Sequence, residues 1–246
     1  MICWRLWDFL VESVEQPVLR GASSCWGTRN RQPPLGLAAQ LVEGGRFLKA
    51  IIFTMRQSHP FISTGRLELI PSTVDLAEQV VDFYKRNEKH LAPWDPPKPA
   101  DFCTESYQRK RLNLAAQDAE AGTAMRWWLC PRNESHTLIG SIGLTAIARG
   151  PFQNAMLGYA IDKQLEGQGL MREALLAIIE HAFSPKIHLH RVQANVRPEN
   201  LRSLRLLESL GFEREGFAKD YLYINGTWRD HVMLALRNQN YEGVPE

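Results

Sequence analysis

The residues best placed to do chemistry lie between positions 157 and 171. Here an apolar, strand-like stretch leads into Gly167-Gln168-Gly169, and an amphipathic helix begins at once. Glycines at such a turn let the backbone approach a ligand closely, and the first amides of a helix have no partners within the helix. Together these features predict a binding site for a phosphate or pyrophosphate group.

Two common uses of a phosphate-binding loop do not fit this segment. The loop lacks the Lys-Ser/Thr pair of a P-loop, and it lacks the third glycine and the ribose-binding acid of a dinucleotide-binding fold. The pattern therefore favours pyrophosphate binding and argues against nucleotide hydrolysis and hydride transfer.

A second group of polar residues stands further along the chain. Asn200 and Ser203 lie at the start of a predicted helix, and Gly211 follows its last apolar residue. Both polar residue types are frequent helix caps, so a purely structural role is one interpretation. A role beside the bound ligand is the other.

The hydrophobic pattern places the elements that must position these residues. Alternation before Pro71 predicts a strand, and Asn225-Gly226 predicts a hairpin between the last two strands. Strands and helices follow one another in an order that predicts a mixed α/β sheet. The expected strands are 66–70, 124–130, 137–148, 155–162, 190–196, 213–224 and 227–236; the expected helices are 76–84, 104–120, 169–183 and 199–210.

Residues 1–54 differ in character from the rest of the 246-residue chain. They hold three of the seven Trp and show no sustained periodicity. They carry six Arg/Lys and four Asp/Glu, so the remaining residues carry 23 of each and the net charge of +2 lies in this extension. A neutral remainder argues against direct nucleic-acid binding. We expect 1–54 to be a poorly specified extension, such as a translated leader, and 55–246 to be the functional domain.

The cysteines and the apolar runs exclude other classes of protein. Four scattered cysteines with no C-x-x-C pair suggest neither a disulfide framework nor a metal site. No apolar run approaches the ~20 residues of a membrane helix. We expect a soluble, cytoplasmic protein that holds no metal.

The combined motifs resemble those of the GNAT N-acetyltransferases, and within them the RimJ/RimL group that modifies ribosomal proteins. The glycine loop, the Asn-x-x-Ser helix and the segment Gly211–Gly216 carry the resemblance to the superfamily. Three longer strings carry the resemblance to the group, and the resemblance as a whole covers roughly residues 60–237. The strings are His90–Pro96, Arg149–Phe152 and Glu213–Val232.

This resemblance implies an α+β GNAT acyltransferase fold, with a mostly antiparallel central sheet flanked by helices, and acetyl-CoA as the acetyl donor. The implied acceptor is the N-terminal amine of a ribosomal protein, the alanine of the fifth small-subunit protein in the most similar branch. Glu166 and Met171 depart from the usual loop, which begins with Gln or Arg and ends with Gly or Ala. The residues implied to contact acetyl-CoA are Tyr159, Ala160 and Ile161 on the strand, the amides of Gly167, Gln168, Gly169, Leu170 and Met171, and Asn200.

The same resemblance suggests catalytic roles for a few side chains. Ser203 is expected to protonate the departing thiolate, because it stands on the helix that flanks the thiol. The strand before the loop offers no carboxylate to serve as general base, so Asp220 is the nearest substitute, followed by Tyr221 and His231. An α-amine of pKa ~7.7–8.0 needs only modest help from a base. Trp94, in a proline-stiffened loop, is expected to line the peptide groove together with Tyr221.

Each of these assignments has a structural alternative. Asp220 could pair with Lys219 or Arg229 across the hairpin, and Trp94 could pack on the domain edge. Two other functions also stay open. One is acetylation of a small amine or antibiotic, and the other is non-catalytic acyl-CoA binding in ribosome assembly. The expected partners are a ribosomal protein substrate and no membrane or nucleic acid, in a monomer or homodimer.

Overall fold

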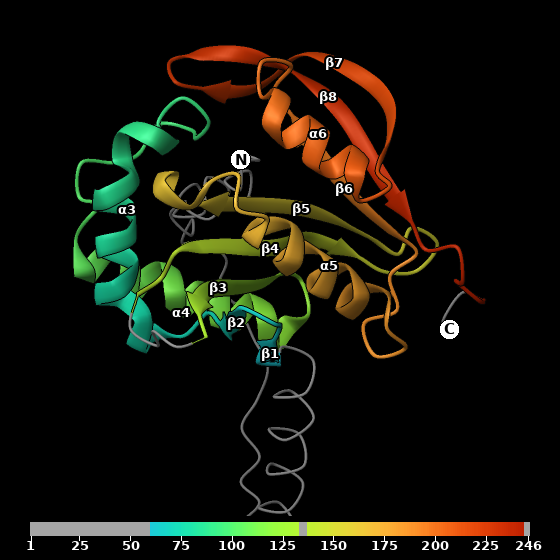
Figure 1. The fold of residues 1–246 in the computed structure, drawn as a ribbon, viewed down its shortest axis with the longest axis horizontal. Coiled ribbons are helices and arrows are strands. Elements are labelled where there is room, and N and C mark those ends of the chain that lie inside the picture. Colours follow the sequence, from blue (N-terminus) through green and yellow to red (C-terminus); the bar gives the residue numbers. More distant parts are fainter. Residues whose placement is uncertain (1–59, 133–136, 244–246) are drawn as a thin grey trace, which may run out of the picture.

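A computed structural model describes residues 60–132 and 137–243 (Figure 1). The expected N-terminal extension, residues 1–54, lies outside the described residues. Within the described part of the chain, no helix combines the length and the apolar character that a membrane span needs.

An eight-stranded sheet forms the centre of the fold, in the order β1-β2-β3-β4-β5-β6-β8-β7. Every neighbouring pair is antiparallel except β5 and β6, which are parallel. The prediction of a mixed, mostly antiparallel sheet is therefore confirmed. The strands are β1 Ile62–Ser63, β2 Leu67–Pro71, β3 Met125–Pro131, β4 Gly140–Ala148, β5 Asn154–Ile161, β6 Arg191–Val196, β7 Glu213–Ile224 and β8 Thr227–Arg237.

Helices cover both faces of this sheet (Figure 1). Side chains alternate between faces along a strand, so the neighbours Trp127 and Trp128 of β3 point in opposite directions. Trp127 packs in the core shared with the two helices that follow β5 and β6, and Trp128 packs in the core shared with the two helices that precede β3. The helices are α3 Ala77–Leu91 and α4 Glu105–Ala121 on one face, and α5 Leu170–Phe183 and α6 Leu201–Ser209 on the other. Two short 3₁₀ turns, Val74–Leu76 and Lys163–Leu165, precede α3 and α5.

Local signals in the sequence set several element ends. The Thr104 hydroxyl accepts the Tyr107 amide at the start of α4, as expected of a helix cap. The hairpin of β7 and β8 turns at Asn225 and Gly226, both with positive φ. The predicted elements are all present, but α3 runs seven residues beyond the expected end at 84, and β1 was not expected. The other ends differ from the expected ones by at most three residues, because hydrophobic spacing does not define where a ladder of hydrogen bonds stops.

Candidate active site

Strand β5, which was expected to hold the donor, pairs with its neighbour β6 over only part of its length. β5 and β6 pair only between Asn154–Met156 and Arg191–Gln193. β5 then continues to Ile161, with β4 as its only strand partner in the described sheet. The edge that carries Tyr159 and Ala160 is thus open on one side, as required for an extended ligand to add to a strand edge.

The turn between β5 and α5 presents a row of backbone donors. Gly167 and Gly169 have φ angles of 77° and 76°, a region that L side chains rarely adopt, so this turn requires both glycines. Among residues 60–132 and 137–243, no acceptor is recorded for the amides of positions 167–171. Such donors at the start of a 14-residue helix form an anion-binding site.

A pocket of about 270 Å³ adjoins this turn. Its wall combines residues of β5, of the turn and of α6, which are separate in sequence. The structure therefore brings most of the residues predicted for the donor site to one cavity. Those that line it are Tyr159, Ile161, Gly167, Gly169, Leu170, Met171 and Ser203.

Ser203 has a partner that the sequence did not reveal. Its hydroxyl lies 2.6 Å from the hydroxyl of Tyr159, and both side chains are almost fully buried. Burial raises the pKa of the Tyr159 phenol, and the bond to Ser203 offsets only part of that shift, so the phenol is protonated at neutral pH. Tyr159 lies on the same face of β5 as Leu157 and Ile161. The two-residue spacing of these side chains was the signal in the sequence that Tyr159 faces the core on the side of α5 and α6.

Asn200 performs the structural role that was considered for it. Its side-chain oxygen accepts the Ser203 amide at 3.2 Å and caps α6. The residue is buried, and its cap places Ser203 in the first turn of the helix. Contact of Asn200 with the donor stays a prediction.

Glu166, the unusual acid at the start of the turn, has two neighbours. Its carboxylate forms an ion pair with Arg202 of α6, and it lies 3.5 Å from Nε2 of His90 in α3. Burial lowers the pKa of His90 more than the Glu166 carboxylate raises it, so Arg202 is the cation of this group at neutral pH. Arg202 thus offsets the charge that Glu166 brings to the edge of the pocket.

The end of β5 is attached to α3 through Asp162. Its carboxylate accepts from Arg86 Nε at 2.6 Å and from Asn87 Nδ2 at 3.2 Å. Burial acts to raise the pKa of Asp162, but the bonds from Arg86, the Gln164 amide and Asn87 outweigh it and lower the pKa. The start of the turn is therefore tied to the helix on the opposite face of the sheet.

The candidate bases lie on β7 and β8. Nδ1 of the buried His231 lies 3.0 Å from the Arg229 carbonyl, which can only accept, so we assign the proton to Nδ1 and the lone pair to Nε2. Burial lowers the pKa of His231, and its ring contacts Tyr221 edge-on. Burial raises the pKa of Tyr221, whose hydroxyl accepts from Asn195 at 2.9 Å.

The remaining candidates are Asp220 for the base and Trp94 for the peptide groove. Asp220 is exposed, with a φ of 47° at an irregular step of β7, and its amide donates to Asp230 at 2.9 Å. The Trp94 ring lies 5.3 Å below the Arg197 guanidinium at the end of β6. The base and groove roles of these two residues stay predictions.

An open strand edge beside an anion-binding turn can hold a ligand that carries a pyrophosphate and an extended arm, as acyl-CoA does. The acetyltransferase (GNAT) domain profile matches residues 66–213, and the chain belongs to this family. It is 39% identical over 165 residues to the ribosomal protein uS5-alanine N-acetyltransferase of Escherichia coli, covering 67% of this chain and 84% of that protein.

Solved structures of the same group share the fold. The ribosomal-protein-S5-alanine acetyltransferase of Vibrio fischeri is 31% identical, with a TM-score of 0.71 over 75% of this chain and all of that one. RimJ of Mycobacterium smegmatis, solved with CoA-disulfide, is 25% identical, with a TM-score of 0.66 over 72% of this chain and 85% of that one. The expected GNAT fold and RimJ/RimL membership are therefore confirmed.

Proposed function

We propose that this acetyltransferase moves the acetyl group of acetyl-CoA to the N-terminal α-amine of a ribosomal protein, with the alanine of uS5 as the first candidate. The observation that supports acetyl-CoA as the donor is the row of amides at 167–171, which lies beside the pocket that Ser203 lines. The relationship to the uS5-alanine enzyme supports the acceptor. The same relationship supports a cytoplasmic location.

The chain's own residues account for the proton movements of the transfer. As the new C–N bond forms and the C–S bond breaks, the amine must lose a proton and the thiolate must gain one. Ser203 is the proposed donor to the thiolate, and its oxygen regains a proton from solvent as the products leave. Tyr159, which burial keeps protonated, is proposed to hold the Ser203 hydroxyl in place. Backbone amides of β5 are proposed to stabilise the oxygen on which negative charge develops.

Asp220 is the proposed acceptor of the amine proton, and His231 is the alternative. An α-amine is partly neutral at pH 7, so either base supplies only a modest contribution. A lysine side chain of pKa ~10.4 needs ~3–4 kcal/mol more deprotonation work, at 1.36 kcal/mol per pKa unit. The lack of a carboxylate on β5 therefore favours an α-amine over a lysine acceptor.

Release of free thiol from acetyl-CoA tests this function with three acceptors. They are a short peptide with a free N-terminal alanine, its N-terminally blocked twin that contains lysine, and an aminoglycoside. We expect the free-alanine peptide to react fastest. Equal or faster reaction of either other acceptor would assign the chain to lysine or small-amine acetylation. Binding of acetyl-CoA without thiol release from any acceptor would support a non-catalytic role.

A further inference from the structure

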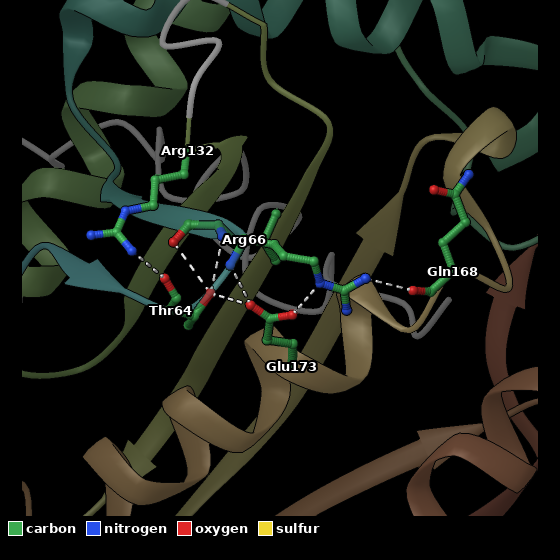
Figure 2. A network of polar contacts seen from close by, with 6 residues as sticks. Thr64, Arg66, Arg132, Gln168 and Glu173 are labelled. Atoms are coloured by element: carbon green, nitrogen blue, oxygen red, sulfur yellow. Dashed lines mark hydrogen bonds and ion pairs between the residues drawn. The ribbon is translucent and has the colours of Figure 1, made fainter.

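The turn between β1 and β2 contacts the anion-binding loop through a chain of polar bonds (Figure 2). The Glu173 carboxylate, in the first turn of α5, accepts from Thr64 Oγ1 at 2.6 Å and from the Arg66 amide at 2.8 Å. It also accepts from Arg66 Nε at 2.7 Å. Burial acts to raise the pKa of Glu173, but the bonds from Thr64 and Arg66 outweigh it and lower the pKa, so the carboxylate stays charged.

Arg66 extends this contact from the helix to the loop itself. Its Nη1 donates to the Gln168 carbonyl at 3.0 Å, and its Nη2 lies 3.5 Å from the point where a Cβ on Gly169 would stand. The guanidinium therefore bridges the junction of loop and helix, as Figure 2 shows. Two fixed donors on one planar group define its orientation, which a lysine ammonium does not do.

The bond to the Gln168 carbonyl constrains a particular peptide plane. In a trans peptide the carbonyl and the following amide point in opposite directions, so a Gln168 carbonyl directed at Arg66 turns the Gly169 amide away from Arg66. Gly169 has a φ of 76°, and glycines permit such a plane to rotate at little cost. A contact from outside the loop can therefore hold this amide in one direction.

We propose that Arg66 is a positioning residue of the donor site, which holds the Gln168–Gly169 peptide so that its amide faces the pyrophosphate. This proposal rests on acetyl-CoA binding as proposed above. The positive charge of Arg66 is already matched by Glu173, so its effect comes from orientation of the loop more than from its charge.

The binding test uses CoA and pantetheine, because pantetheine has the arm but lacks the pyrophosphate. We expect Arg66→Ala to weaken CoA binding about 10-fold, the worth of one charge-assisted hydrogen bond, and to leave pantetheine binding within about two-fold. Arg132→Ala is the matched control, since Arg132 Nη1 donates to the Thr64 carbonyl at 3.4 Å from the other side of the turn and, within the described residues, makes no bond to the loop. It should leave both affinities unchanged.

Two further variants separate orientation from charge. Arg66→Lys keeps the charge but cannot make both bonds, so we expect it to bind CoA as weakly as Arg66→Ala. The pair Arg66→Ala with Glu173→Gln removes both charges, and we expect the weak binding to persist. Restored CoA affinity in either variant, or equal weakening for pantetheine, would overturn the proposal.

A spectroscopic measurement tests the loop independently of the donor. In the protein without CoA, we expect the Gly169 amide resonance to be single in wild type and in Arg132→Ala, and broadened or doubled in both Arg66→Ala and Arg66→Lys. Unchanged resonances in the Arg66 variants would overturn the positioning role. If wild type gave a single resonance but did not bind CoA, the proposed function would fail while the role of Arg66 in the loop stood.

Discussion

Replacing Ser203 by alanine has two separable consequences. The Ser203 and Tyr159 hydroxyls are 2.6 Å apart, and their side chains are 2% and 3% exposed. Alanine leaves the buried Tyr159 hydroxyl with the long 3.5 Å bond to the carbonyl of residue 203, so we expect the free energy of unfolding to fall by up to ~1–3 kcal/mol. In a domain of this size we expect the melting temperature to fall by about 2–4 °C for each kcal/mol.

The effect on the rate has a different origin. General-acid assistance is worth ~10²–10⁴-fold, and it acts in the transition state. We therefore expect Ser203→Ala to lower kcat by that range, while the Kd for acetyl-CoA changes little. Steady-state thiol release with the free-alanine peptide measures the first quantity, and calorimetry measures the second.

Adding Tyr159→Phe distinguishes loss of the acid from loss of packing. The double variant leaves neither hydroxyl of the pair buried alone, so its melting temperature should return most of the way to that of wild type. Its kcat should stay as low as that of Ser203→Ala, because the proton donor is still missing. If kcat recovers together with stability, or if Ser203→Ala turns over at the wild-type rate, Ser203 is a structural residue and the acid lies elsewhere.

Further changes test the surroundings of the loop. Gly169→Glu should abolish CoA binding in calorimetry, because it adds a side chain at a φ of 76° and a negative charge beside the phosphates; unchanged affinity in a folded variant would refute the loop assignment. Glu166→Gln should tighten CoA binding by about two- to five-fold, the worth of a weak charge contact, and high salt should reduce the gain. The pKa values of Asp162 and Glu173 are lowered in the folded state, so their stabilisation is complete above their usual values of 3.8 and 4.5 and is lost as pH falls through the lowered ones. Thermal melts should show this decline, and Glu173→Gln should flatten it. A chain that begins at Met55 should fold and turn over like the full chain, and an insoluble or inactive product would make the extension part of the domain.

The elements and the glycine turn could be predicted because their signals are local. Apolar periodicity and the Asn225-Gly226 turn each act over a few residues. The glycine turn likewise combines a strand end, two glycines and a helix start within one short segment. Such signals require no knowledge of how distant parts of the chain meet.

The long-range contacts of the candidate site could not be predicted from such local signals. Tyr159 meets Ser203 across 44 positions of the chain, and Arg66 meets Glu173 across 107. Periodicity indicates which face of the sheet a side chain occupies, but the partner it finds there depends on the crossing of strands and helices. The base was equally difficult to assign, because burial and tautomer distinguish His231 from Asp220 and neither is visible in the sequence.

Three elements outside the loop, namely α3, α6 and the β1–β2 turn, form polar contacts with the loop and its flanks. Arg86 of α3 bonds to Asp162 before the loop, Arg202 of α6 pairs with Glu166 at its start, and Arg66 of the β1–β2 turn holds the carbonyl of its middle residue. A glycine-rich loop left to itself would lose considerable conformational entropy on meeting a ligand. Because contacts from separate elements already order the backbone, we expect the amides to need little rearrangement on binding a pyrophosphate, so that more of the interaction free energy appears as affinity.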